Sequence, residues 1–122
     1  MSTEISKKRK TTGMVMAGLL TAFLLFTALG KLTMPAMAEN FQKWGLGDWR
    51  IIIAAGEIVS VLLFLIPRTG IVGTLLLSSY FGGAIMVHMV HGESFLVPAA
   101  VLVYVWITAF IRYPELSERL RG

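Results

Sequence analysis

The chain has 122 residues, of which 56% are hydrophobic and only 15% are charged. Soluble domains carry about 25% charged residues, so this composition excludes an ordinary soluble domain and favours an integral membrane protein. The net charge of +4 does not indicate nucleic-acid binding, because much of it comes from one basic run, Lys7–Lys10, and no basic surface interleaved with aromatic residues follows.

Cysteine is absent, which excludes disulfides, thiolate metal ligands and a cysteine nucleophile. Any redox role would therefore use a bound cofactor or a partner. The length allows one membrane domain, residues 13–122, preceded by a basic cytoplasmic tail, residues 1–12, that we expect to be disordered.

Four apolar stretches follow the tail, and they predict an all-α fold, an integral membrane four-helix bundle. A membrane span needs about 20 residues. The expected spans are 13–31, 48–66, 70–90 and 95–112. The second reaches span length only if its first residues enter the membrane interface, a zone that Trp49 favours.

The distribution of basic residues predicts that both termini lie in the cytoplasm. In that orientation Lys31, Lys43 and Arg50 are outside, and all the other Lys and Arg residues are inside, where basic residues concentrate. We expect a multi-pass protein of the bacterial inner membrane. Ala36-Met37-Ala38 also resembles a signal-peptide cleavage site, but the preceding apolar run of about 18 residues is longer than a signal peptide needs.

A short amphipathic helix is predicted between the first two spans. Met37, Phe41 and Trp44 share one face, and Gly45 can adopt the left-handed conformation that ends a helix. We expect this helix to lie flat at the outer interface. The alternative is a lid over a site between the spans.

Small residues are frequent in the third span, and they predict close packing against its neighbours. Gly73, Ser78, Gly82 and Gly83 are the candidates, because small side chains let helix backbones approach closely in lipid. The short connections on either side of this span make it an antiparallel neighbour of the second and the fourth.

Glu57 is the candidate around which a site would form, because it lies inside an otherwise apolar span. It is placed about eight residues, or roughly 12 Å, below the outer interface. Lys31 and His88 lie at the outer ends of the first and third spans, so the three groups are expected to share a polar pocket in the outer half of the bundle. Thr27 and Ser60 fall on the faces of Lys31 and Glu57, and His91 lies one turn beyond His88, so these three are the expected supporting residues of the pocket.

Three interpretations of this cluster stay open. It is a working site that binds a polar headgroup or relays protons, a buried ion pair that sets helix register, or a protonated Glu57 with Lys31 extended to the interface. His88 and His91 are one turn apart, but without a specific third ligand they do not predict a metal site.

Three segments resemble the DoxX-like family of small four-helix bacterial membrane proteins: TALGKL (Thr27–Leu32), GEIVSVLLFLIPRTG (Gly56–Gly70) and SYFGGAIMVHMVHGE (Ser79–Glu93). The resemblance extends over residues 13–120. The family name comes from similarity to subunits of a terminal quinol oxidase and a thiosulfate:quinone oxidoreductase. The resemblance implies roles for Lys31, Glu57 and His88, whereas the lack of cysteine argues against direct sulfur chemistry.

We therefore expect an accessory or quinone-associated subunit of a membrane redox system, with little or no catalysis alone. In this hypothesis His88 hydrogen-bonds a quinone carbonyl and Glu57 exchanges protons. One alternative is a non-enzymatic scaffold that docks other membrane or redox proteins, or further copies of itself. The last is a pathway for a small solute or protons.

Overall fold

The computed structural model describes residues 7–121, and every regular element in this range is helical, which confirms the all-α prediction. The elements are α1 (Lys7–Thr33), α2 (Pro35–Lys43), the 3-10 turn η1 (Gly47–Trp49), α3 (Arg50–Leu65), the 3-10 turn η2 (Pro67–Thr69), α4 (Gly70–Val90), α5 (Leu96–Arg112) and α6 (Pro114–Arg121).

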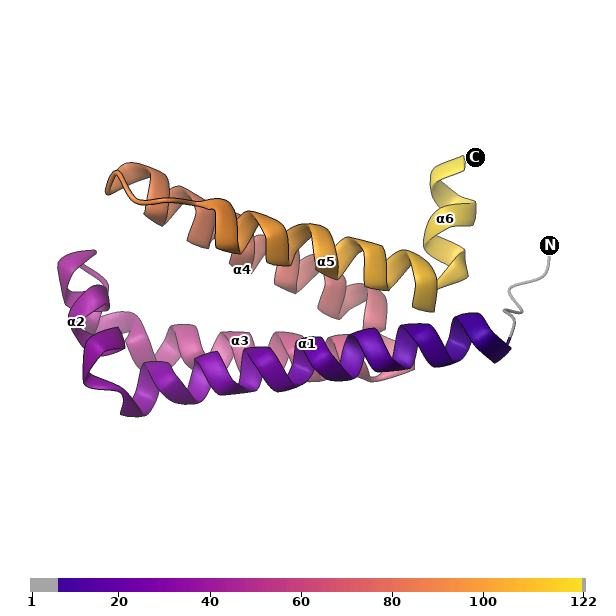
Figure 1. Ribbon diagram of the computed structural model, residues 1–122, viewed down its shortest axis with the longest axis horizontal. Coiled ribbons are helices and arrows are strands. Elements are labelled where there is room, and N and C mark those ends of the chain that lie inside the picture. Colours follow the sequence, from indigo (N-terminus) through magenta and orange to yellow (C-terminus); the bar gives the residue numbers. More distant parts are fainter. Residues whose placement is uncertain (1–6, 122) are drawn as a thin grey trace.

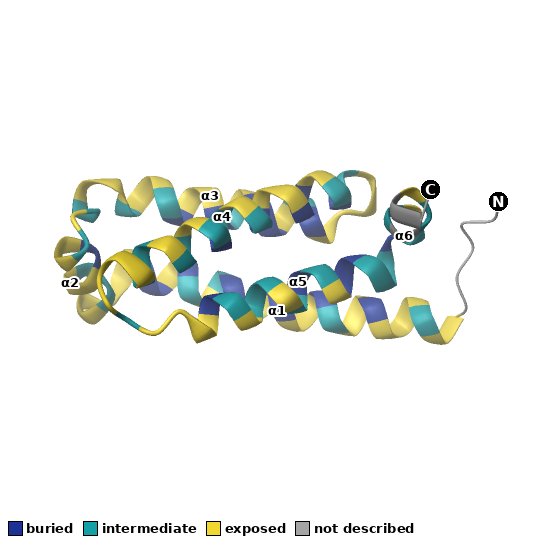
Figure 2. Cartoon of the chain, turned by 90° about the horizontal axis from the view of Figure 1, so that it is seen from above, coloured by how far each residue is buried: buried dark blue, intermediate teal, exposed yellow. Residues whose placement is uncertain are grey.

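The four long helices pack side by side, each against two neighbours. α1 lies against α3 and α5, and α4 lies against the same two helices from the other side (Figure 1). Side chains buried between the helices form the core, and the residues that face outward are largely exposed (Figure 2). The fully buried side chains include Phe64 of α3, Leu77 of α4 and Val105 of α5.

Two stretches of the described chain are long and apolar enough to cross a membrane, judged by length and composition: Lys7–Thr33 and Pro67–Val90. α3 has 16 residues and α5 has 17, against a spanning range of about 17–25 residues. The chain thus combines two helices of clear spanning length with two shorter helices packed against them.

The basic segment before the first apolar stretch is helical where it is described, which corrects the prediction of a disordered tail for residues 7–12. Residues 1–6 of that expected tail lie outside the described residues. The physical reason for the longer helix is a contact with the end of α5. Arg9 donates hydrogen bonds to the carbonyls of Ile111 at 2.9 Å and Phe110 at 2.6 Å, which are among the last carbonyls of α5 and lack helical partners.

The two ends of the helix assembly are each covered by a short helix. α2 begins with a proline, as helices often do, and ends before Gly45, whose φ of 76° is the left-handed conformation predicted for it. α6 was not predicted as a separate helix. It follows Tyr113, whose hydroxyl donates a hydrogen bond to the carbonyl of Phe64 and so holds the α5–α6 corner against α3.

Close helix packing occurs at only part of the predicted stripe of small residues. A Cβ built on Gly73 would collide with the backbone nitrogen of Phe64, so α3 and α4 touch there. Ser78 donates its hydroxyl to the carbonyl of Thr74 within its own helix. At Gly82 and Gly83 a Cβ would meet nothing within 4 Å. The prediction of close packing at these two glycines was therefore wrong, because Gly82 is only half-buried and Gly83 is exposed, while the neighbouring Phe81 faces the core.

Candidate functional site

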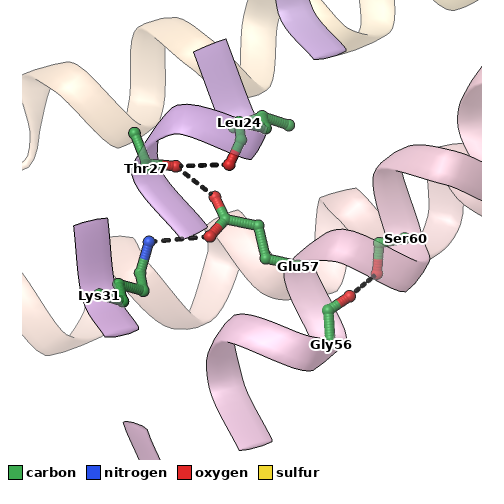
Figure 3. A network of polar contacts seen from close by, with 6 residues as sticks. All are labelled: Leu24, Thr27, Lys31, Gly56, Glu57 and Ser60. Atoms are coloured by element: carbon green, nitrogen blue, oxygen red, sulfur yellow. Dashed lines mark hydrogen bonds and ion pairs between the residues drawn. The ribbon is translucent and has the colours of Figure 1, made fainter. Parts of the chain in front are cut away.

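Lys31 and Glu57 form a buried ion pair between α1 and α3. Lys31 Nζ lies 2.8 Å from Glu57 Oε1 (Figure 3). Glu57 is 1% exposed and Lys31 is 8% exposed. An ionised carboxylate so deeply buried requires a charged partner, and Lys31 supplies it.

The second oxygen of the Glu57 carboxylate also accepts a hydrogen bond. Thr27, one turn before Lys31 on α1, lies with its Oγ1 2.7 Å from Glu57 Oε2 (Figure 3). Thr27 Oγ1 is also 3.0 Å from the Leu24 carbonyl, but its single proton favours the charged acceptor. Ser60, another predicted supporting residue, donates to the Gly56 carbonyl at 2.6 Å, and no bond joins it to the pair among the described residues.

Tyr80 of α4 is a member of the cluster that the sequence analysis missed. Lys31 Nζ lies 5.7 Å from the centre of its ring, and the Tyr80 hydroxyl interacts with the Glu57 carboxylate. The signal was present in the sequence, because Tyr80, Ala84 and His88 recur every four residues and so share one face of a helix.

His88 lies in the same region but makes no hydrogen bond to Lys31 or Glu57 among the described residues. Its Nδ1 is 2.7 Å from the Ala84 carbonyl. A carbonyl can only accept, so Nδ1 carries the proton and Nε2 of the neutral ring is an acceptor. The His88 ring also lies 5.2 Å from the ring of Trp44 on α2. His91 is exposed, bonds to the Val87 carbonyl at 2.9 Å and lies apart from this cluster.

A cavity of about 510 Å³ joins these groups at the α2 end of the helices. Its lining comes from α1, α2, α3, α4 and α5, which is wider than the three spans expected from the sequence. The polar or ionisable members of the lining are Thr27, Lys31, Asn40, Trp44, Glu57, Ser79, Tyr80 and His88. The rest of the lining is almost entirely apolar.

α2 covers this cavity, in the position that the lid alternative describes. Its Met37, Asn40, Phe41 and Trp44 all contribute to the lining. Phe41 is 5% exposed, and its ring packs 5.3 Å from that of Trp44. The apolar face predicted for this helix is thus turned toward the cavity.

Glu93, in the connection between α4 and α5, holds α2 in place. Lys43 Nζ lies 3.0 Å from Glu93 Oε2, and Trp44 Nε1 donates to Glu93 Oε1 at 2.9 Å. The hydrogen bond from Lys43 lowers the pKa of Glu93, and the bond from Trp44 and the positive charge of Lys43 act in the same direction. We call Lys43, Trp44 and Glu93 the clasp.

The donor set does not resemble a metal centre. Among residues 7–121, no group of three or more His, Asp or Glu side chains is placed to hold a metal ion. Lys31 has three N–H donors and His88 Nε2 is an acceptor. Together with the apolar walls, these groups suit a largely apolar molecule whose polar head both donates and accepts hydrogen bonds.

Comparisons with known proteins address the chain as a whole. The family model of the DoxX-like family matches residues 15–110, a range that contains Lys31, Glu57, His88 and the clasp. The comparisons with curated proteins and with solved structures found no match. Because the family model covers most of the chain, the protein belongs to the DoxX-like family.

Proposed function

We propose that the protein is a four-helix bundle embedded in the bacterial inner membrane. In this proposal α1, α3, α4 and α5 are the spans, and both termini lie in the cytoplasm. Large apolar side chains on the outward faces support this proposal. Phe26 is 67% exposed, Ile52 is 62% exposed and Leu75 is 56% exposed. Such side chains on every long helix suit contact with lipid and are costly against water.

We further propose that the cavity binds the head of a quinone or quinol. The observation that carries this proposal is the combination within one cavity of about 510 Å³ of a buried Lys31–Glu57 pair, the acceptor Nε2 of His88 and apolar walls. A quinone ring is flat, apolar on its faces and polar at two ends, and its chemistry when bound would be reversible electron and proton transfer.

Lys31, His88 and Glu57 would each have a different role in binding the quinone head. One N–H of Lys31 donates to Glu57, and its other N–H groups would donate to a carbonyl oxygen of the quinone. His88 Nε2, as an acceptor, would take a hydrogen bond from a quinol hydroxyl, which reverses the donor role expected for His88 from the sequence. Glu57 already accepts two hydrogen bonds, so we assign it the positioning of Lys31 and assign proton acceptance to His88.

The role that fits this site is an accessory, quinone-binding subunit of a membrane redox system. A scaffold that docks partners or further copies does not require an internal cavity lined by buried polar groups. A solute or proton pathway needs polar groups along the whole bundle, yet below the cavity the core contains Phe64, Leu77 and Val105. The buried hydroxyls of Thr74 and Thr108 bond to carbonyls of their own helices.

Binding of decylubiquinol to the protein in lipid nanodiscs tests the proposal, with the dissociation constant taken from quenching of tryptophan fluorescence. His88→Leu leaves the Lys31–Glu57 pair intact, and we expect it to weaken binding roughly tenfold, the effect of losing one buried hydrogen bond. His91→Leu is the matched control and should bind normally, since His91 is exposed and outside the cavity.

Glu57→Gln should weaken binding by a similar factor or more, while Glu39→Gln, an exposed carboxylate on α2, should not. Each variant is normalised to its own ligand-free fluorescence. Equal affinity in the native protein, His88→Leu and Glu57→Gln would rule out a quinone site in this cavity, and so would the absence of saturable quenching.

A further inference from the structure

The seam between α1 and α5 is closed at one end only. Near the α6 end, Arg9 bonds to the α5 carbonyls, and a Cβ built on Gly13 would lie 2.6 Å from the side chain of Arg112. Further along, the hydroxyl of Tyr104 donates to the carbonyl of Met16 at 2.8 Å. Figure 1 shows α1 and α5 diverging from there toward the α2 end.

A second hollow begins where the seam opens. It is a groove of about 340 Å³ between α1 and α5, lined by Leu19, Leu20, Phe23, Ala100, Val101 and Tyr104. Apart from the Tyr104 hydroxyl, which is already bonded to Met16, these side chains are apolar. A groove of this composition offers a polar group no hydrogen-bond partner, but it accommodates hydrocarbon.

The groove adjoins the cavity. Phe23 of α1 and Val101 of α5 line both. Thr27, beside the ion pair, is eight residues from Leu19, which corresponds to about 12 Å along α1. Counted from Lys31, the α1 residues of the groove lie eight to twelve positions away, from Phe23 to Leu19. A molecule with its head at Lys31 would therefore reach the groove about two to three helical turns deeper in the bundle.

The other end of the cavity is covered. Met37, Phe41 and Trp44 of α2 line it, and the clasp bonds α2 to the connection between α4 and α5. A ligand with a long apolar chain would have to expose that chain to water if it pointed toward α2. Toward the groove, the chain stays among apolar side chains and lipid.

We propose that the ligand is a lipid-soluble quinone with a long hydrocarbon tail, and that this tail leaves the cavity between α1 and α5 and lies in the groove. This inference rests on the proposed function, because it takes the quinone head to be at Lys31 and His88. It adds the class of quinone and its route: a tailed quinone that enters sideways from the bilayer, in place of a small water-soluble one that enters past α2.

Photo-crosslinking tests the route directly. The probe is a ubiquinone analogue with a ten-carbon tail that carries a diazirine near its end, added to the protein in nanodiscs. We expect labelled peptides to contain Leu19–Phe23 and Ala100–Tyr104, and an excess of tailless ubiquinone-0 to suppress this labelling. Labelling that the tailless quinone suppresses but that falls on α3 or α4 would overturn the route and leave the proposed function standing.

A phospholipid with a diazirine in its acyl chain is the second arm. If it labels the groove and ubiquinone-0 does not displace it, the groove holds bilayer lipid and the inference is wrong. If ubiquinone-0 fails to suppress labelling by the quinone probe, and Glu57→Gln does not change that labelling, the head does not bind in the cavity and the proposed function fails with it.

A pair of variants gives an independent measurement. Ala100→Phe fills the groove, and we expect it to weaken binding of decylubiquinone at least fivefold without changing binding of ubiquinone-0. Ala55→Phe, on an exposed position of α3 outside both hollows, should change neither. Equal losses for both ligands in Ala100→Phe would mean that the substitution disturbs the cavity, and unchanged binding of both would place the tail elsewhere; either result contradicts the proposed route.

Discussion

Lys31 Nζ and Glu57 Oε1 lie 2.8 Å apart although 26 residues separate them in the chain. The contact joins the last turn of α1 to the middle of α3, across the connection that contains α2. It therefore sets the register of these two helices at the level of the cavity. The same contact places Lys31 in the lining of the cavity, so under the proposed function one pair would both set the helix register and bind the ligand.

Breaking this pair from one side should destabilise the protein more than removing it altogether. Lys31→Met leaves a buried carboxylate without its cation, at a cost of about 3 kcal/mol in the free energy of unfolding. The double variant Lys31→Met, Glu57→Leu should be more stable than Lys31→Met. Unfolding in mixed detergent micelles measures both.

The exposed pair formed by Lys43 and Glu93 is the control for that experiment. The Lys43 side chain is 62% exposed, so Lys43→Met should change the free energy of unfolding by about 1 kcal/mol or less. A double variant less stable than Lys31→Met would contradict the argument from an unpaired buried charge.

Thr27→Val should cost about 2 kcal/mol, because it removes a hydrogen bond to a buried charged group while keeping the shape of the side chain. Thr33→Val is the matched control. Thr33 is exposed and its hydroxyl bonds only to the Leu29 carbonyl, so we expect a change within about 0.5 kcal/mol. Equal effects of the two substitutions in the same unfolding assay would show that the bond to Glu57 contributes nothing.

Gly73→Ala and Gly82→Ala should differ sharply although both glycines lie in the same helix. At Gly73 the new methyl group would collide with the backbone of Phe64, which forces α3 and α4 apart, so we expect a loss of at least about 2 kcal/mol. At Gly82 the methyl group meets open space, and a helical alanine stabilises by up to about 1 kcal/mol. Thermal unfolding in detergent distinguishes the two, and similar melting temperatures would contradict the packing described for α4.

The clasp predicts that α2 opens at low pH. Lys43 and Trp44 lower the pKa of Glu93. At pH values above the ordinary carboxyl pKa of 4.5, the Glu93 carboxylate is therefore charged and the clasp holds α2 in place. This stabilisation is lost as the pH falls through the lowered pKa of Glu93. Lys43 and His88 are the charged or titratable groups that act on Glu93. The chain has no cysteine, so spin labels at Glu39→Cys and Ser94→Cys report the distance from α2 to the α4–α5 connection.

We expect one narrow distance distribution at neutral pH and a broader, longer one once the pH has fallen below the lowered pKa of Glu93. In Glu93→Gln the distribution should no longer depend on pH in this range. Persistent pH dependence in Glu93→Gln would mean that another group controls α2.

The positions of the helices and the pairing of Lys31 with Glu57 could be predicted because both follow from properties of local sequence. Apolar runs and turn residues mark both ends of α3, α4 and α5 within two residues, whereas α1 begins six residues before its predicted start. Counting 1.5 Å per residue places the charged groups at comparable depths. A lone carboxylate in an apolar run then points to a nearby cation.

Other features could not be predicted because they depend on how each helix is rotated and inclined. Gly82 and Gly83 look as suitable for packing as Gly73, yet only Gly73 faces a neighbour at close range. The ring of Tyr80 approaches Lys31 only because α4 turns that face inward. Arg9 is helical at a place where composition suggests disorder, because the end of α5 lies beside it.

The sequence by itself determined the class of fold, the helices and the buried charge that needs a partner, since apolar periodicity and the cost of an unpaired charge act along one chain segment at a time. Only the tertiary structure decided that α2 closes over a cavity, that Glu93 holds it there, and that the α1–α5 seam opens into a groove. These depend on side chains brought together from distant segments, where small changes in helix tilt separate a packed contact from a hollow.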